Sequence, residues 1–140
     1  MKILLCVDGS SHSDRATQHV IATTKDCEDR EIFLVNVQPP IDAPEVRSHM
    51  TASEIEAMQE TRGGDALASA RALLDAAGVR YTPVVLLGPI AETLVEFARE
   101  HGCEKIVMGT RGLGALGSAL LGSVSQDVLR LSHLPVTLVK

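Results

Sequence analysis

The residues of this sequence that are best suited to chemistry lie between Met108 and Ser125, a stretch that holds five of the eleven glycines. It follows a short apolar run and leads into a helical pattern. A strand, a glycine-rich loop and a helix start together present backbone N–H groups to an anion. This order predicts a phosphate-binding loop. The alternative is a loop whose glycines only permit tight turns.

Two glycines in this stretch have the spacing found in nucleotide hydrolases, but the residues that follow them do not fit. Gly117 and Gly122 match GxxxxG, whereas Ser123 and Val124 stand where a Lys and a Ser or Thr are required. Without that lysine, a site of this type loses its main positive charge on the β- and γ-phosphates. We therefore exclude a Walker-type hydrolase.

The glycine spacing of a dinucleotide-binding fingerprint is also present, but its position in the chain does not fit. Gly112, Gly114 and Gly117 match GxGxxG, but they precede the last predicted strand, and no further strand with an acidic ribose ligand follows them. We interpret that match as accidental. The pattern that remains is Gly109-x2-Gly112-x9-Gly122-Ser123.

This remaining pattern predicts how a phosphate would be held. Gly109 and Gly112 would let the backbone approach a ligand that a Cβ atom would exclude. The segment 123–126 (SVSQ) predicts a capping box, so a helix is expected to begin at the end of the loop. The free N–H groups of that helix and the hydroxyls of Ser123 and Ser125 would bind two phosphates.

The pattern of apolar residues predicts five strands that alternate with helices. Strands are expected at Ile3–Asp8, Ile32–Val37, Arg80–Leu87, Lys105–Met108 and Val136–Val139, and Pro83 places the third of them at a sheet edge. Helices are expected at about 11–25, at 51–77, at about 89–101 and from Ser123 onward. Gly78 lies directly after the second of them, and Pro89 is expected as the first helical residue of the third. Residues 41–50 are expected to form a loop, and Gly63-Gly64 to kink or split the second helix.

This alternation predicts an α/β, Rossmann-like fold with an open parallel sheet and helices on both faces. The aliphatic composition suits a sheet that is buried on both sides. In such sheets, ligands bind outside the carboxyl ends of the strands. Asp8, Val37 and Met108 each end a predicted strand, so we expect them to converge on one crevice.

Length, charge and composition limit the function classes. The 140 residues predict a single domain over 1–140, with 45% hydrophobic and 2% aromatic residues. A net charge of −5 without a Lys/Arg cluster argues against a nucleic-acid partner. Three cysteines without CxxC spacing indicate a reducing compartment, with Cys6 as a core residue. No signal peptide or membrane-spanning run is evident, so we expect a cytoplasmic protein without a membrane partner.

Other side chains that could carry chemistry have simpler interpretations. The five histidines lack the spacing of metal ligands, so we expect them to be solvated helix residues. Asp8, Ser10 and Ser13 could form a nucleophile site, but no motif places a histidine as their base. A capping and turn role is the better interpretation of these serines.

Four stretches of this sequence resemble the universal stress protein family, in its branch that binds ATP. They are Val7-Asp8-Gly9-Ser10, Gly88-Pro89, 108–112 and 122–125, and the glycine spacing from Gly109 to Ser123 is that branch's ATP-binding signature. The similarity runs in order from Ile3 to Val139. The resemblance implies a strand order of 3-2-1-4-5 and a homodimer formed through the C-terminal strand at 136–140.

The resemblance also implies a role for each site residue. Asp8 and the Val7 backbone would contact the adenosine, and Val37 the adenine edge, while Met108 and Gly109 would line the base and ribose. The phosphates would be held by Gly112, Gly122, Ser123, Val124 and Ser125. Members often carry a basic residue within 113–121, but here that segment has none, and Arg111 is the nearest cation. Triphosphate binding would then depend on backbone donors and the helix dipole, with or without Mg²⁺.

These observations predict an ATP-binding regulatory or stress-response protein. No general base, arginine finger or pair of Mg²⁺-binding carboxylates is evident near the loop, so a fast enzyme is not expected. One alternative is a slow ATPase or a self-phosphorylating switch with Ser123, Ser125 or Thr110 as acceptor. The other is a dimeric interaction module whose nucleotide is structural or absent. The sequence identifies no protein partner.

Overall fold

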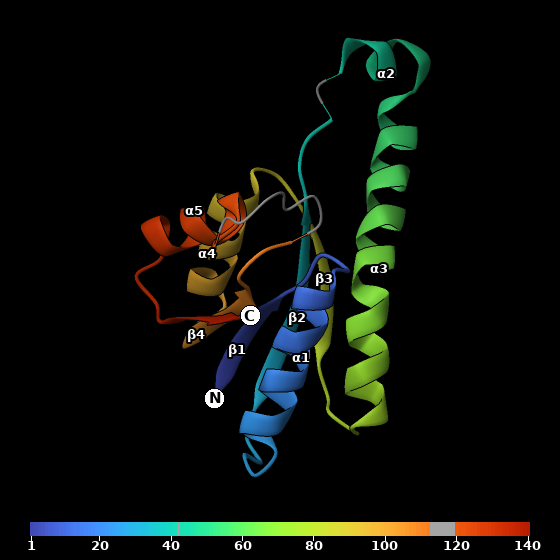
Figure 1. The fold of residues 1–140 in the computed structure, drawn as a ribbon. Coiled ribbons are helices and arrows are strands. Elements are labelled where there is room, and N and C mark those ends of the chain that lie inside the picture. The colour runs from blue at the N-terminus through green and yellow to red at the C-terminus, as the bar shows by residue number, and fades with distance from the viewer. Residues whose placement is uncertain (42, 113–119) are drawn as a thin grey trace.

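The computed structural model describes residues 1–41, 43–112 and 120–140, and within these ranges the chain forms five strands and five helices (Figure 1). Their order is β1 (Lys2–Cys6), α1 (Ser11–Thr24), β2 (Glu31–Gln38), α2 (Pro44–His49), α3 (Ala52–Ala76), β3 (Thr82–Leu87), α4 (Ile90–Glu100), β4 (Lys105–Gly109), α5 (Ser123–Leu131) and β5 (Val136–Val139). No helix in the described residues is both long and apolar enough to span a membrane.

The five strands form one parallel sheet in the order β3-β2-β1-β4-β5, which confirms the predicted α/β fold and strand order. β1 lies at the centre, with β2 and β4 on either side of it. The chain moves outward from β1 to β3 and then returns to place β4 on the opposite side of β1. Strand order therefore reverses between β1 and β4, which is where open α/β sheets bind ligands.

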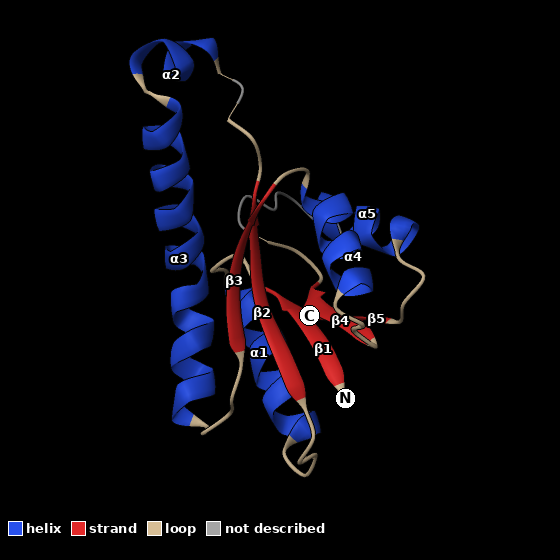
Figure 2. Ribbon diagram, turned by 180° about the vertical axis from the view of Figure 1, so that it is seen from behind, coloured by secondary structure: helices blue, strands red, loops and turns tan. Residues whose placement is uncertain are grey.

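Helices cover both faces of the sheet, as Figures 1 and 2 show from opposite sides. Side chains of β1 alternate between the two cores: Ile3 and Leu5 pack beneath α1 and α3, whereas Leu4 packs beneath α4 and α5. Because both faces are buried, each inner strand is a continuous apolar run rather than an alternating one. That is why its carboxyl end, where polar residues begin, is easily recognised.

α3 is one continuous helix of 25 residues, so the predicted kink or split at Gly63-Gly64 is wrong. A Cβ atom at Gly63 would collide with the Val85 side chain of β3, whereas one at Gly64 would meet nothing within 4 Å. Gly63 therefore serves close packing of the helix on the sheet. The amino-terminal part of α3 extends beyond the sheet and ends beside α2 (Figure 1).

The segment predicted as a loop at 41–50 contains the short helix α2, which is a second correction. Its local sequence explains it. Pro44 begins the helix, Glu45 lies in the first turn, and Arg47 and His49 lie in the last turn. This order of charges complements the helix dipole.

The boundaries of the other elements agree closely with the sequence patterns. Gly78 adopts φ 68° directly after α3, as expected of a helix-terminating glycine. Pro83 lies in β3, which is an edge strand as predicted. Pro89, expected as the first helical residue of α4, instead occupies the N-cap position one residue earlier. Ser10 caps α1 by accepting the Ser13 N–H at 3.2 Å, which confirms its capping role.

Candidate functional site

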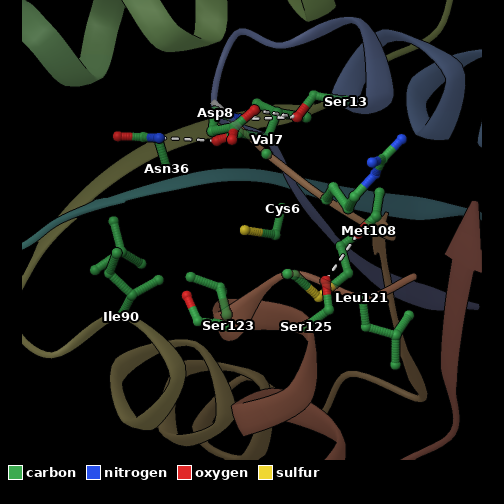
Figure 3. Close-up of a pocket in the computed structure, with 16 residues that line it drawn as sticks. Cys6, Val7, Asp8, Ser13, Asn36, Ile90, Met108, Leu121, Ser123 and Ser125 are labelled. Carbon is green, nitrogen blue, oxygen red and sulfur yellow. Dashed lines mark hydrogen bonds between the residues drawn. The ribbon is translucent and has the colours of Figure 1, made fainter. Parts of the chain in front are cut away.

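A cavity of about 400 Å³ lies at the carboxyl ends of β1, β2 and β4 (Figure 3). This volume is within the range of about 300–1,000 Å³ that small-molecule sites occupy. All eleven residues singled out from the sequence line it: Val7, Asp8, Val37, Met108, Gly109, Arg111, Gly112, Gly122, Ser123, Val124 and Ser125. The expected convergence of strand ends is therefore present in the structure.

Asp8 is fixed at the end of β1 by the first turn of α1. Its Oδ1 accepts the Ser10 N–H at 2.9 Å and the Ser13 hydroxyl at 2.8 Å, and its own N–H donates to Ser13 Oγ at 2.9 Å. The two serines thus hold the carboxylate in one orientation toward the cavity. This arrangement supports the capping and turn interpretation of the serines over a nucleophile site.

The two glycines of the loop are explained by contacts within the protein, which differs from the reason inferred from the sequence. A Cβ atom at Gly109 would come within 2.7 Å of His12 Cβ on α1, and one at Gly112 would collide with Asp8 Oδ2. The backbone passes close to neighbouring protein atoms at both points. Absence of side chains here lets the loop pack against α1 and the end of β1, so that both border the cavity.

Thr110 joins the loop to two other elements. Its N–H donates to the Val139 carbonyl of β5 at 2.9 Å, and its carbonyl accepts the Gly122 N–H at 2.8 Å. The buried Ser125 hydroxyl lies 3.1 Å from the Gly109 carbonyl and 2.9 Å from the Thr110 carbonyl, to which it donates. The two ends of the loop are therefore tied together, and the Ser125 side chain supports the backbone of the site.

α5 begins at the loop as predicted, but the capping box expected over 123–126 is wrong. Gly122 is the N-cap and offers no side-chain cap, Ser123 is the first helical residue, and Gln126 donates to the Leu121 carbonyl at 3.1 Å. The first turn of a helix leaves N–H groups without intrahelical acceptors. At the start of α5 these belong to Ser123, Val124 and Ser125, which border the cavity. This helix end therefore carries donors without an intrahelical acceptor, together with positive dipole potential.

Part of the cavity wall is apolar. Val37 of β2, Ile90 of α4 and Met108 of β4 line it together with Cys6, which was predicted as a core residue and lies at the cavity surface. Burial, together with the Asp8 charge, raises the pKa of the Cys6 thiol from 9.0 to about 12. Cys6 is thus a neutral, weakly polar part of this wall near neutral pH.

Among the described residues that line the cavity, two carry a formal charge, Asp8 and Arg111. Their charges cancel, so a polyanion bound in the described part of the site would depend mainly on N–H groups and the helix dipole. Gly114, Gly117 and most of the segment noted for lacking a cation lie outside the described residues.

Sequence reasoning did not select Asn36, Ser13, Ile90 and Leu121, which also line the cavity. Asn36 had a recognisable signal, because it is a polar residue inside the apolar run IFLVNV. Ile90 and Leu121 had none, since apolar residues beside loops are common, and Ser13 was noted beside Asp8 but interpreted as a capping residue. They reach the cavity only because the fold brings the loops after β1, β3 and β4 together.

A parallel sheet whose strand order reverses beside a cavity, with helices on both faces, defines a doubly wound α/β domain. Comparison with known sequences then gives the family: the chain belongs to the universal stress protein family, whose sequence model matches residues 1–140.

Two relatives illustrate the match. A universal stress protein of Methanocaldococcus jannaschii is 36% identical over 99% of this chain and 81% of its own length. One of Thermus aquaticus is 35% identical over 99% of this chain and 97% of its own.

Solved structures give the same result. A second protein of M. jannaschii, whose biochemical function was assigned from its structure, superposes with a TM-score of 0.83 at 27% identity, covering 99% of this chain and 94% of that one. Universal stress proteins with the same fold, at 19–23% identity, have been solved with cAMP, with dAMP (Archaeoglobus fulgidus) and with AMP (Arabidopsis thaliana). Structural neighbours of this chain therefore bind adenine nucleotides.

Proposed function

We propose that this protein binds ATP in the cavity at the carboxyl ends of β1, β2 and β4, and that it acts as a cytoplasmic regulatory or stress-response protein. The phosphates would lie at the start of α5, and the base would lie against the apolar wall. In this proposal residues 1–140 act as a single domain. Asp8 and the Val7 backbone would contact the adenosine, with Val37 at the adenine edge.

The observation that carries this proposal is the uncapped start of α5. α1 and α3 have side-chain caps, whereas α2, α4 and α5 have none. The first three residues of α5, Ser123 to Ser125, all line the cavity. Unsatisfied donors at a helix start bind anions well. Here they lie in a cavity that is also lined by the apolar side chains of Val37, Ile90 and Met108. A phosphate joined to a base by a sugar fits both parts.

Two variants of Ser123 test where the phosphates bind. Ser123 is exposed and is the first helical residue of α5, a position where an acidic side chain stabilises the helix by about 0.3–1 kcal/mol. Ser123→Asp is therefore expected to fold at least as stably as the wild type but to weaken ATP binding at least about tenfold by charge repulsion. Ser123→Asn has the same shape as Ser123→Asp without the charge, so it should bind ATP about tenfold more tightly than Ser123→Asp, and the pair isolates the effect of the charge.

Calorimetric titration with ATP at fixed salt measures both variants. Equal affinities for ATP in the Asp and Asn variants would place the phosphates elsewhere. The same titrations with and without Mg²⁺ show whether the metal ion accompanies the nucleotide. We expect binding without Mg²⁺, because the donors are N–H groups of the chain.

Identification of the nucleotide released from freshly purified, denatured protein separates this function from its alternatives. ATP that stays bound and unchanged for hours would exclude a fast enzyme. ADP accumulation or a phosphorylated Ser123, Ser125 or Thr110 would favour a slow ATPase or self-phosphorylating switch. Absence of nucleotide, with no rise in melting temperature at saturating ATP, would favour a nucleotide-free interaction module, because a ligand at about 100 times its Kd adds about 2.7 kcal/mol of stability.

We also propose that two copies join through β5. β5 pairs with β4 along one side only, and its residues Val136–Val139 are partly exposed. An apolar edge strand of this kind is prone to pair with another chain. Pairing at 136–140 would bury that edge in a homodimer.

A further inference from the structure

The backbone pairing between β1 and β2 stops one hydrogen bond short of the cavity. The last bond of this ladder runs from the Val7 N–H to the Val35 carbonyl at 3.0 Å, and the last paired residues are Cys6 and Val35. In a parallel ladder the next bond would run from the Val37 N–H to the Val7 carbonyl. That bond is not made between these described residues.

A side chain occupies the Val7 carbonyl instead. Asn36 Nδ2 donates to it at 2.8 Å, and Asn36 Oδ1 accepts from Gln38 Nε2 at 2.7 Å. Asn36 is only 5% exposed and lines the cavity beside Val7 (Figure 3). The Val7 carbonyl can only accept a hydrogen bond, so it fixes the Asn36 amide with its nitrogen toward Val7 and its oxygen toward Gln38.

The direction of the Val37 peptide follows from its neighbours. Along β2, the Val35 carbonyl points toward β1, where it accepts Val7, whereas the Gln38 carbonyl points toward β3, where it accepts the Gly88 N–H at 3.1 Å. Backbone groups alternate between the two sides of a strand, so the N–H and carbonyl of Val37 point to the β1 side. β1 has ended at this level, and the cavity lies there.

We propose that Asn36 is a positioning residue for base recognition: it takes the Val7 carbonyl and thereby keeps the Val37 N–H available to a ligand. The inference deepens the proposed ATP site and depends on it. An N–H and a carbonyl of one extended residue match a base edge that places an acceptor beside a donor. Adenine has this order at N1 and its 6-amino group, whereas guanine and hypoxanthine present an N–H at position 1. Asn36 therefore influences the base selectivity of the site indirectly, by keeping the Val37 N–H available.

The variant Asn36→Leu tests this role because it keeps the approximate volume and removes the amide. Without the amide, the Val37 N–H can close on the Val7 carbonyl and extend the ladder. ATP should then bind about fivefold to tenfold more weakly, the effect of one net hydrogen bond. The analogue 1-deaza-ATP, which has C–H in place of N1, cannot accept that bond, so its affinity should change by less than about twofold.

The comparison of the two ligands separates positioning from a general structural effect. A structural defect would weaken ATP and 1-deaza-ATP equally, and that result would overturn the proposal. So would an unchanged affinity for ATP in Asn36→Leu. Gln38→Met is the matched control, because it removes a neighbouring amide and leaves the bond between Asn36 and Val7; ATP affinity should stay within about threefold.

Amide hydrogen exchange gives a second measurement that does not require the variant to fold. In the wild-type protein without nucleotide, the Val37 amide should exchange much faster than the Val35 amide, and saturating ATP should slow it. Equal protection of the two amides in the nucleotide-free protein would refute the open N–H. If the wild type binds neither ATP nor 1-deaza-ATP, the proposed function fails, whereas the exchange comparison in free protein still tests the interrupted ladder.

Discussion

Replacement of Gly112 by alanine tests the construction of the site most directly. A Cβ atom at this position would collide with Asp8 Oδ2 and lie 3.2 Å from Asp8 Cγ. Gly112 does not have the left-handed φ that favours glycine, so alanine strains no backbone angle there. The effect of the substitution should therefore come from the carboxylate contact.

The magnitude follows from what Asp8 would lose. To avoid the new methyl group the carboxylate must turn, which weakens its bonds from the Ser10 N–H at 2.9 Å and the Ser13 hydroxyl at 2.8 Å. A hydrogen bond to a charged group contributes about 1.5–3 kcal/mol, and the lower value suits this partly exposed carboxylate. Loss of one or both bonds predicts destabilisation by about 1.5–3 kcal/mol. For a chain of this size, that is a fall in melting temperature of roughly 5–10 °C.

Urea unfolding of Gly112→Ala, Asp8→Ala and the double variant measures this coupling. The glycine substitution should cost little stability once the carboxylate is absent. The interaction free energy from the double-mutant cycle should therefore be about 1.5–3 kcal/mol. ATP titration of Gly112→Ala should also show at least about a tenfold loss, equivalent to about 1.4 kcal/mol. An unchanged penalty in the Asp8→Ala background, or a penalty below about 0.5 kcal/mol in the wild type, would refute the reasoning.

Three further predictions follow. Gly64→Ala, in open space within a helix, should stabilise the protein by about 0.5–1 kcal/mol, whereas Gly63→Ala should destabilise it by about 1–3 kcal/mol in the same urea assay. Folding raises the pKa of the Cys6 thiol from 9.0 to about 12. Above pH 9 the thiol therefore ionises in the unfolded chain before it ionises in the folded protein, and the free energy of unfolding falls. Between pH 8 and 10 the wild type should lose about 1 kcal/mol more stability than Cys6→Ala. Val136→Pro should yield a folded monomer by light scattering, because the Val136 N–H faces the open edge of β5. Thr137→Pro should instead remove a hydrogen bond of the ladder with β4 and make the protein unfold more readily.

The sequence was sufficient to predict the strands because both faces of this sheet are buried. The runs at Ile3–Asp8 and Ile32–Val37 have no polar interruption until the site is reached, apart from Asn36. Val7, Asp8, Val37, Met108 and Gly109 line the cavity because strand ends in a parallel sheet meet at one edge. The other six predicted site residues follow β4 in the loop and the start of α5, and they were found from the glycine spacing. The short helix α2 was missed because six residues contain too few turns to show periodicity.

The reasons for particular glycines could not be obtained from the sequence. Gly63 and Gly112 are explained by Val85 and by Asp8, partners 22 and 104 residues away in the chain, and only the assembled fold brings these pairs together. The same holds for Asn36, whose polarity was visible in the sequence but whose partner, the Val7 carbonyl, was not. Local patterns predict elements, whereas contacts between distant segments determine why one residue type is required.

The bond between the Gly122 N–H and the Thr110 carbonyl has a consequence for how this site can diversify. The bond joins the end of β4 to the start of α5, so the two ends of the connection between these elements are fixed to each other. Doubling the length of such a segment adds only about 0.6 kcal/mol of closure entropy. We therefore expect insertions and deletions between Thr110 and Gly122 to cost the fold little, because the sheet and the start of α5 stay in place.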